Sequence, residues 1–354
     1  MGSAPVGAAG SSKPTLVEPL LTSREEDDAN TEQTKTNRHC SLPMQPGFCW
    51  RRLALPKHLK VILVVSLLYL AVGAVLWPVV HFADFPGPLH SCTLQQEVSP
   101  FTFLAAHSDG ATLHGLSFPL PAAEPRPEQG AAVTPVVFFG GNPEQMTGII
   151  QQARQLFEPL LEQTPHQHLQ VHIAAYRGYA PNEGWTTQEG LRNDAIDLLQ
   201  HVQKDLQPEL SRVVVAGVSL GSAVALQLAA ARPEDVAGLL IFAPWESLWT
   251  ETVFFRPPWT FLLYPWLWVS FRWDSSSAAA TLPPEMPVAV LSPQADETIP
   301  AWQHRAVFEA LGSGSRFWLP AEDVGHSGIL TMAYMCTGPL HEWMEESEQR
   351  VRRG

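Results

Sequence analysis

Residues 212–231 read RVVVAGVSLGSAVALQLAAA, a β-branched apolar run followed by a run of small and apolar residues. The first run is typical of a buried strand, and the second is typical of a helix. Between them lies a Gly-x-Ser-x-Gly pattern made by Gly217, Ser219 and Gly221. The two glycines permit a sharp strand-to-helix turn that exposes the serine hydroxyl at the end of the strand. The stretch therefore predicts a strand–turn–helix unit with Ser219 as candidate nucleophile.

Strand and helix patterns alternate on both sides of this unit. Two further apolar runs suggest a hairpin across Asp109-Gly110, which would give the sheet an antiparallel start. The expected strands are 101–106, 112–118, 135–139, 171–175, 212–216, 237–242, 287–291 and 316–319. The expected helices are 144–161, 187–204, 219–231, 301–311 and 328–348. This alternation predicts a mostly parallel sheet with helices on both faces, which is an α/β fold.

A serine nucleophile needs a base, and the base needs an acid that orients it. In a fold with this kind of turn, the three follow in the order Ser, Asp, His. Asp296 and His326 each come just after one of the last two predicted strands, so both are expected at the sheet edge that holds Ser219. An ordinary surface Asp and loop His are the alternative, and Glu246 is a rival for the acid. The predicted catalytic residues are Ser219, Asp296 and His326.

Acyl transfer also needs hydrogen-bond donors for the oxyanion that develops on the substrate. The backbone N–H of Leu220, the residue after the candidate nucleophile, is one expected donor. The second is expected from the loop after strand 135–139, where Gly141 is the candidate. This chemistry requires no metal and no other cofactor.

The segment 245–280 breaks the alternation. It holds six of the twelve Trp of the chain, and prolines at 257, 258 and 265 exclude one long helix. We expect a cap inserted over one end of the sheet. The candidate substrate-binding side chains in it are Trp245, Trp249, Phe254 and Phe255. The alternative is an insertion that only packs against the domain.

An uncharged run of twenty residues at 61–80 is long enough for a membrane helix of about 30 Å. A signal peptide or a buried helix would usually be shorter. Four basic residues precede the run and Asp84 follows it, so the positive-inside rule places the preceding tail in the cytosol. The prediction is a disordered cytosolic tail over 1–58, a transmembrane helix over 59–81, and a lumenal or extracellular catalytic domain over 95–350.

Composition excludes other classes of protein. Of 354 residues, 45% are hydrophobic, which is enough to bury a core. The net charge of −13 disfavours a nucleic-acid binder, which needs a basic face. Four Cys are too few and too scattered for a disulfide scaffold or a clustered zinc site. A globular enzyme or receptor remains.

The chain resembles the membrane-anchored α/β-hydrolase-domain serine hydrolases over residues 98–345. The resemblance rests on an ordered set of motifs: Asp109-Gly110, Tyr176-Arg177-Gly178-Tyr179, Glu189-Gly190-Leu191 before Asp194, the Gly-x-Ser-x-Gly pattern, Asp296 to Pro300 and Gly325-His326. It implies an α/β-hydrolase fold and hydrolysis of ester or thioester bonds in lysophospholipids, monoacylglycerols or S-acylated proteins. The chain departs from the family at Phe139, where His is common, and this departure bears on the packing of the oxyanion loop.

We therefore expect a single-pass membrane serine hydrolase that cleaves carboxylic esters of amphiphilic lipids. The expected partner is a lipid or acyl-ester substrate at the membrane surface, with no nucleic acid involved. A protein S-acyl thioesterase and a catalytically silent binding module on the same fold are the alternatives, and peptidase activity stays open.

Overall fold

The computed structural model describes residues 59–71, 98–121, 133–142, 146–164, 167–205, 212–250 and 272–353. The chain divides into two units, 1–56 and 57–354, and the first lies wholly outside these residues. The predicted tail over 1–58, the second half of the predicted membrane helix and residues 251–271 of the predicted cap also lie outside them.

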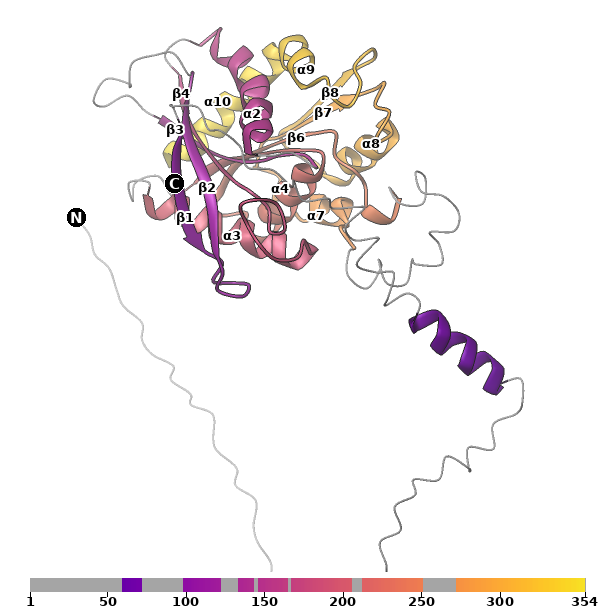
Figure 1. The fold of residues 1–354 in the computed structure, drawn as a ribbon. Helices are drawn as coiled ribbons and strands as arrows, with labels where there is room; N and C mark the ends of the chain where they lie inside the picture. The colour runs from indigo at the N-terminus through magenta and orange to yellow at the C-terminus, as the bar shows by residue number, and fades with distance from the viewer. Residues whose placement is uncertain are drawn as a thin grey trace, which may run out of the picture. The chain divides into compact units, whose positions relative to one another are not determined.

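Among the described residues, one eight-stranded sheet forms the framework of the α/β domain (Figure 1). The strand order is β1-β2-β4-β3-β5-β6-β7-β8. The first two pairings, β1 with β2 and β2 with β4, are antiparallel, and all others are parallel. This confirms the predicted mostly parallel sheet with an antiparallel start. The strands are β1 (Ser99–Leu104), β2 (Thr112–Leu120), β3 (Val133–Phe139), β4 (His168–Ala174), β5 (Val213–Val218), β6 (Val236–Phe242), β7 (Val288–Pro293) and β8 (Arg316–Ala321).

Helices cover both faces of this sheet, because the strand side chains are apolar on both sides. Val137 and Phe139 of β3 pack into the cluster that includes α3, α4, α7 and α8, whereas Val136 and Phe138 pack with α2, α9 and α10. Figure 1 shows α2, α9 and α10 across the sheet from α3 and α4. The helices are α2 (Met146–Leu161), α3 (Gln188–Asp205), α4 (Leu220–Ala231), α7 (Ser275–Ala280), α8 (Ala301–Ala310), α9 (Ile329–Met335) and α10 (Thr337–Arg353).

A buried ion pair connects residues from three of the sequence motifs. Arg177 follows β4, and its Nε and Nη2 donate to both carboxylate oxygens of Asp194 in α3, at 2.6 and 2.5 Å. Its Nη1 donates to Asp109 of the β1–β2 turn at 3.0 Å. Burial raises the pKa of the Asp194 carboxyl, while the guanidinium beside it lowers that pKa. The guanidinium thus joins the first hairpin, β4 and α3.

The helices of the structure differ from the predicted ones in two places. The single helix expected over 328–348 is two helices, α9 and α10, with a break at Cys336. Pro339 has no N–H to donate to the carbonyl of Met335, and proline is tolerated only in the first turn of a helix, so a new helix begins at Thr337. The short helix α7 was not expected, because its residues were assigned to the cap.

Residues 59–71 form a separate helix whose apolar side chains are exposed, among them Val61 and Leu68 at 61% and 60%. Within the described part of the chain, no helix combines the length and the apolar character that crossing a membrane requires.

Candidate active site

The carboxyl ends of the parallel strands meet at one edge of the sheet, and the loops that follow β3, β5, β7 and β8 gather there. Ser219 lies between β5 and α4 with φ 53° and ψ −116°, a backbone conformation that residues other than glycine rarely adopt. Its N–H donates to the carbonyl of Phe242 in β6 at 2.9 Å. The Ser222 hydroxyl lies 2.9 and 2.7 Å from the carbonyl oxygens of Gly217 and Phe242, and its single hydrogen is shared between them. These bonds hold the strained turn in place.

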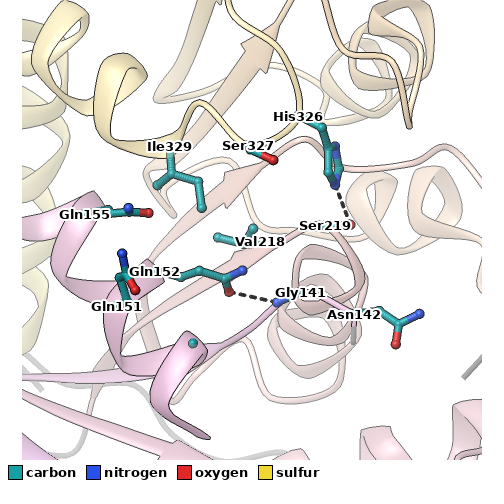
Figure 2. Close-up of a pocket in the computed structure, with 11 residues that line it drawn as sticks. Gly141, Asn142, Gln151, Gln152, Gln155, Val218, Ser219, His326, Ser327 and Ile329 are labelled. Carbon is teal, nitrogen blue, oxygen red and sulfur yellow. Dashed lines mark hydrogen bonds between the residues drawn. The ribbon is translucent and has the colours of Figure 1, made fainter. Parts of the chain in front are cut away.

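The structure brings Ser219, His326 and Asp296 into one hydrogen-bonded chain. The distance from His326 Nε2 to Ser219 Oγ is 3.2 Å, and Figure 2 shows the imidazole ring directed at the hydroxyl. On its other side, His326 Nδ1 lies 2.7 Å from Asp296 Oδ2. The Asp296 carboxylate is fully buried, and its Oδ1 accepts from the backbone N–H groups of Thr298 and Ile299 at 2.8 and 2.7 Å. The carboxylate is therefore held in a single orientation.

The rival acid, Glu246, is used elsewhere. Its Oε2 accepts from the Thr250 hydroxyl at 3.1 Å. A carboxylate that sequence reasoning missed does contact the histidine: Glu297 Oε2 accepts from the backbone N–H of His326 at 3.1 Å. This hydrogen bond lowers the pKa of Glu297 and fixes the loop that carries the imidazole. Its position next to Asp296 in the sequence was the available signal.

A second histidine, also missed, faces the same acid. His304 in α8 is fully buried, and its Nε2 lies 3.6 Å from Asp296 Oδ2. Its Nδ1 lies 3.0 Å from Ser292 Oγ, which accepts a hydrogen bond from the Gln294 side chain at 2.7 Å. At 3.6 Å from Asp296 Oδ2, His304 Nε2 is beyond hydrogen-bond distance, and it has no hydrogen-bond partner among the described residues.

Burial lowers the pKa of His304 from 6.5 to about 4. Between these two values the unfolded chain binds a proton at His304 that the folded chain does not, so stability falls as the pH drops through this window. We expect the loss at pH 4 to be about 3 kcal/mol. Thermal melts of wild type and His304→Gln from pH 8 to pH 4 test this. The wild type should lose more stability than the variant below pH 6.5, and parallel curves would contradict the expectation.

A pocket of about 360 Å³ opens beside Ser219 and His326. Among the described lining residues, His326 is the only one with an ionisable side chain of the Asp, Glu, Lys, Arg or His type, and Val218 and Ile329 are apolar. Uncharged polar side chains come from Asn142, Gln151, Gln152, Gln155 and Ser327. Three of these are glutamines of α2, which pack beside the loop after β3 (Figure 2). Such a lining suits a neutral polar group rather than a charged one.

The two expected oxyanion donors differ in this structure. Leu220 is the first residue of α4, where backbone N–H groups have no partner within the helix. The N–H of Gly141, however, donates to Oε1 of Gln152 at 3.0 Å. The prediction required a free N–H at Gly141, but in this structure that N–H already has an acceptor.

Of the four aromatic residues predicted to bind substrate, the two described ones, Trp245 and Trp249, are not among the described residues that line this pocket. Trp245 is buried in the core, with its ring centre 6.4 Å from that of Trp273. Trp249 is 47% exposed. Phe254 and Phe255 lie outside the described residues. Trp245 and Trp273 lie near the two ends of the predicted cap, and both belong to the hydrophobic core. Both ends of the predicted cap therefore include residues that pack against the domain.

The chain is similar to a hydrolase family model and to several known proteins. A hydrolase family model described as "Serine aminopeptidase, S33" matches residues 146–284. The uncharacterized protein YfhR of Salmonella typhi is 31% identical over 231 residues, which are 61% of this chain and 70% of YfhR. The alpha/beta hydrolase domain-containing protein WAV2 of Arabidopsis thaliana is 29% identical over 113 residues, which are 32% of this chain and 34% of WAV2.

Among solved structures, the esterase Pf2001 of Pyrococcus furiosus matches with a TM-score of 0.54 and 12% identity, over 73% of this chain and 98% of the esterase. At this identity the likeness concerns the fold alone.

Proposed function

Because the chain belongs to the α/β-hydrolase superfamily and is a serine hydrolase, we propose that it cleaves carboxylic ester bonds through Ser219, His326 and Asp296. The observation that carries the proposal is the chain of contacts from Ser219 Oγ through the imidazole to the buried Asp296 carboxylate. A serine, a base and an orienting acid in this geometry form the recurring arrangement for acyl transfer.

The proposed reaction has two halves. Ser219 Oγ attacks the acyl carbonyl while His326 Nε2 takes its proton, and the electron pair of the carbonyl bond moves onto oxygen. The oxyanion then collapses, and the alcohol leaves with the proton from His326. Water, activated by the same imidazole, hydrolyses the acyl-enzyme and returns Ser219 to its starting state. Asp296 holds Nδ1 protonated throughout, so Nε2 is the nitrogen that exchanges protons.

The proposed substrate is an amphiphilic lipid ester of the monoacylglycerol or lysophospholipid type. The uncharged side chains of the pocket favour a glycerol group, whose hydroxyls pair with amides, over a phosphate, which would favour a nearby cation. Monoacylglycerol is therefore the better candidate of the two.

Hydrolysis rates for a panel of substrates test this proposal. The panel is a monoacylglycerol, a lysophosphatidylcholine, an S-acyl thioester and an aminoacyl p-nitroanilide, each with the purified full chain. We expect the monoacylglycerol to give the highest kcat/KM. Faster cleavage of the thioester would favour the S-acyl thioesterase alternative, and faster cleavage of the anilide would favour a peptidase. A folded protein with no activity and no labelling by a fluorophosphonate would favour the binding module.

We also propose a single membrane anchor at 59–81, with the tail cytosolic and the catalytic domain lumenal or extracellular. The twenty uncharged residues and the basic residues before them support it, as does the exposed apolar surface of helix 59–71.

Protease protection in sealed microsomes tests the orientation. With a tag at each end of the chain, added protease should remove the N-terminal tag and spare the C-terminal one, and detergent should abolish the protection. Loss of the C-terminal tag before detergent is added would contradict this topology.

A further inference from the structure

Gln152 occupies an unexpected place in the candidate active site. Its side chain reaches from α2 across the pocket to the loop after β3, where its Oε1 accepts the Gly141 N–H at 3.0 Å (Figure 2). A backbone N–H only donates, so the amide atom that faces it must be the oxygen. This contact fixes the orientation of the amide, and the Nε2 donors point away from Gly141 N–H.

The freed donors border the space in front of Ser219. The point that a side chain on Gly141 would occupy lies 3.4 Å from Gln152 Nε2 and 3.6 Å from Ser219 Cβ. Gln152 and Ser219 also line the same pocket. Among the described residues, no acceptor for Nε2 is found within hydrogen-bond distance. The amide hydrogens of Gln152 thus have no partner among the described residues, and they lie in the pocket that Ser219 also lines.

We propose that Gln152 is a catalytic residue whose side-chain Nε2 donates to the oxyanion, while Gly141 N–H positions its amide. This inference rests on the proposed function. As Ser219 Oγ bonds to the acyl carbon, the electron pair of the carbonyl moves onto oxygen, which accepts from Gln152 Nε2–H and from Leu220 N–H. An amide pinned in advance needs no reorganisation when the charge develops, which is the condition for strong electrostatic stabilisation.

The alternative is that Gln152 blocks the Gly141 N–H and so keeps it from donating to the oxyanion. If Gly141 N–H were the true donor, Gln152 would have to leave before each turnover. The two roles predict opposite effects of removing the side chain. Without the amide, an obstructed enzyme becomes faster, whereas an enzyme that uses Nε2 becomes slower.

The test compares Gln152→Glu and Gln152→Ala with wild type on one ester substrate. Glu keeps an acceptor for Gly141 N–H but has no donor and adds negative charge, so kcat should fall by about 10²-fold to 10³-fold with little change in KM. Ala frees Gly141 N–H, which replaces part of the lost interaction, so the fall should be smaller but at least about tenfold. Gln349→Glu, the same change on the exposed side of α10, is the matched control.

Binding of a trifluoromethyl ketone, which forms an oxyanion on Ser219, supplies a readout independent of turnover. Its Ki should rise in each variant by about the factor that kcat/KM falls. A Gln152→Ala enzyme as fast as wild type, or faster, would overturn the inference, as would an unchanged Ki in a folded variant. Wild type that neither hydrolyses the ester nor binds the ketone would instead refute the proposed function.

Discussion

Ser219→Ala is expected to lower kcat/KM for an ester by about 10⁴-fold or more, and His326→Ala should be as severe. The reason is geometric: His326 Nε2 lies 3.2 Å from Ser219 Oγ, and the proposed attack needs both the hydroxyl and the base that takes its proton. The double variant should consequently be no slower than either single one. Ser219→Ala should not lower the melting temperature by much, because the serine hydroxyl makes no other hydrogen bond among the described residues. His326→Ala should lower it more, because it removes the partner of the buried Asp296 carboxylate.

Steady-state hydrolysis and fluorophosphonate labelling measure these effects. Ser222→Ala is a useful comparison, since its hydroxyl supports the turn by bonding to the carbonyls of Gly217 and Phe242. It should lower stability as well as activity. If Ser219→Ala retained hydrolysis within about tenfold of wild type, Ser219 would not be the nucleophile.

Gly221→Ala is expected to cost about 4 kcal/mol or more of folding stability. A Cβ at this position would collide with the carbonyl groups of Phe139 and Gly140, which belong to the backbone at the end of β3 and cannot rotate away. The helix α4 would have to move off β3, and the turn that carries Ser219 would move with it. Activity and stability should therefore be lost together.

Gly338→Ala is the matched control, because a Cβ there meets nothing within 4 Å and the residue lies in the first turn of α10. Alanine is the better helix former by up to about 1 kcal/mol, so this variant should be as stable as wild type or slightly more stable. Urea unfolding of the two variants tests the pair. Equal stabilities would contradict the close approach of α4 to β3.

Sequence patterns were sufficient to predict the alternation of strands and helices, and with it the parallel sheet. They also placed Ser219, Asp296 and His326 after their strands, because the ends of parallel strands meet at one edge and chain order is visible without coordinates. Two features were missed for different reasons: the break at Cys336 depends on the position of Pro339, and the short α7 depends on packing. The periodicity of the sequence records neither.

Contacts between side chains of different elements could not be predicted in this way, because they depend on tertiary packing. Gln152 lies eleven residues from Gly141 in sequence, yet the packing of α2 beside β3 brings its amide to that backbone N–H. His304 faces Asp296 because α8 packs on β7, and Trp245 is buried because Trp273 returns to it from the far end of the predicted cap. The periodicity of a sequence reports which face of an element is apolar. The distances between side chains of different elements depend instead on how those faces pack, and they appear only once the chain has folded.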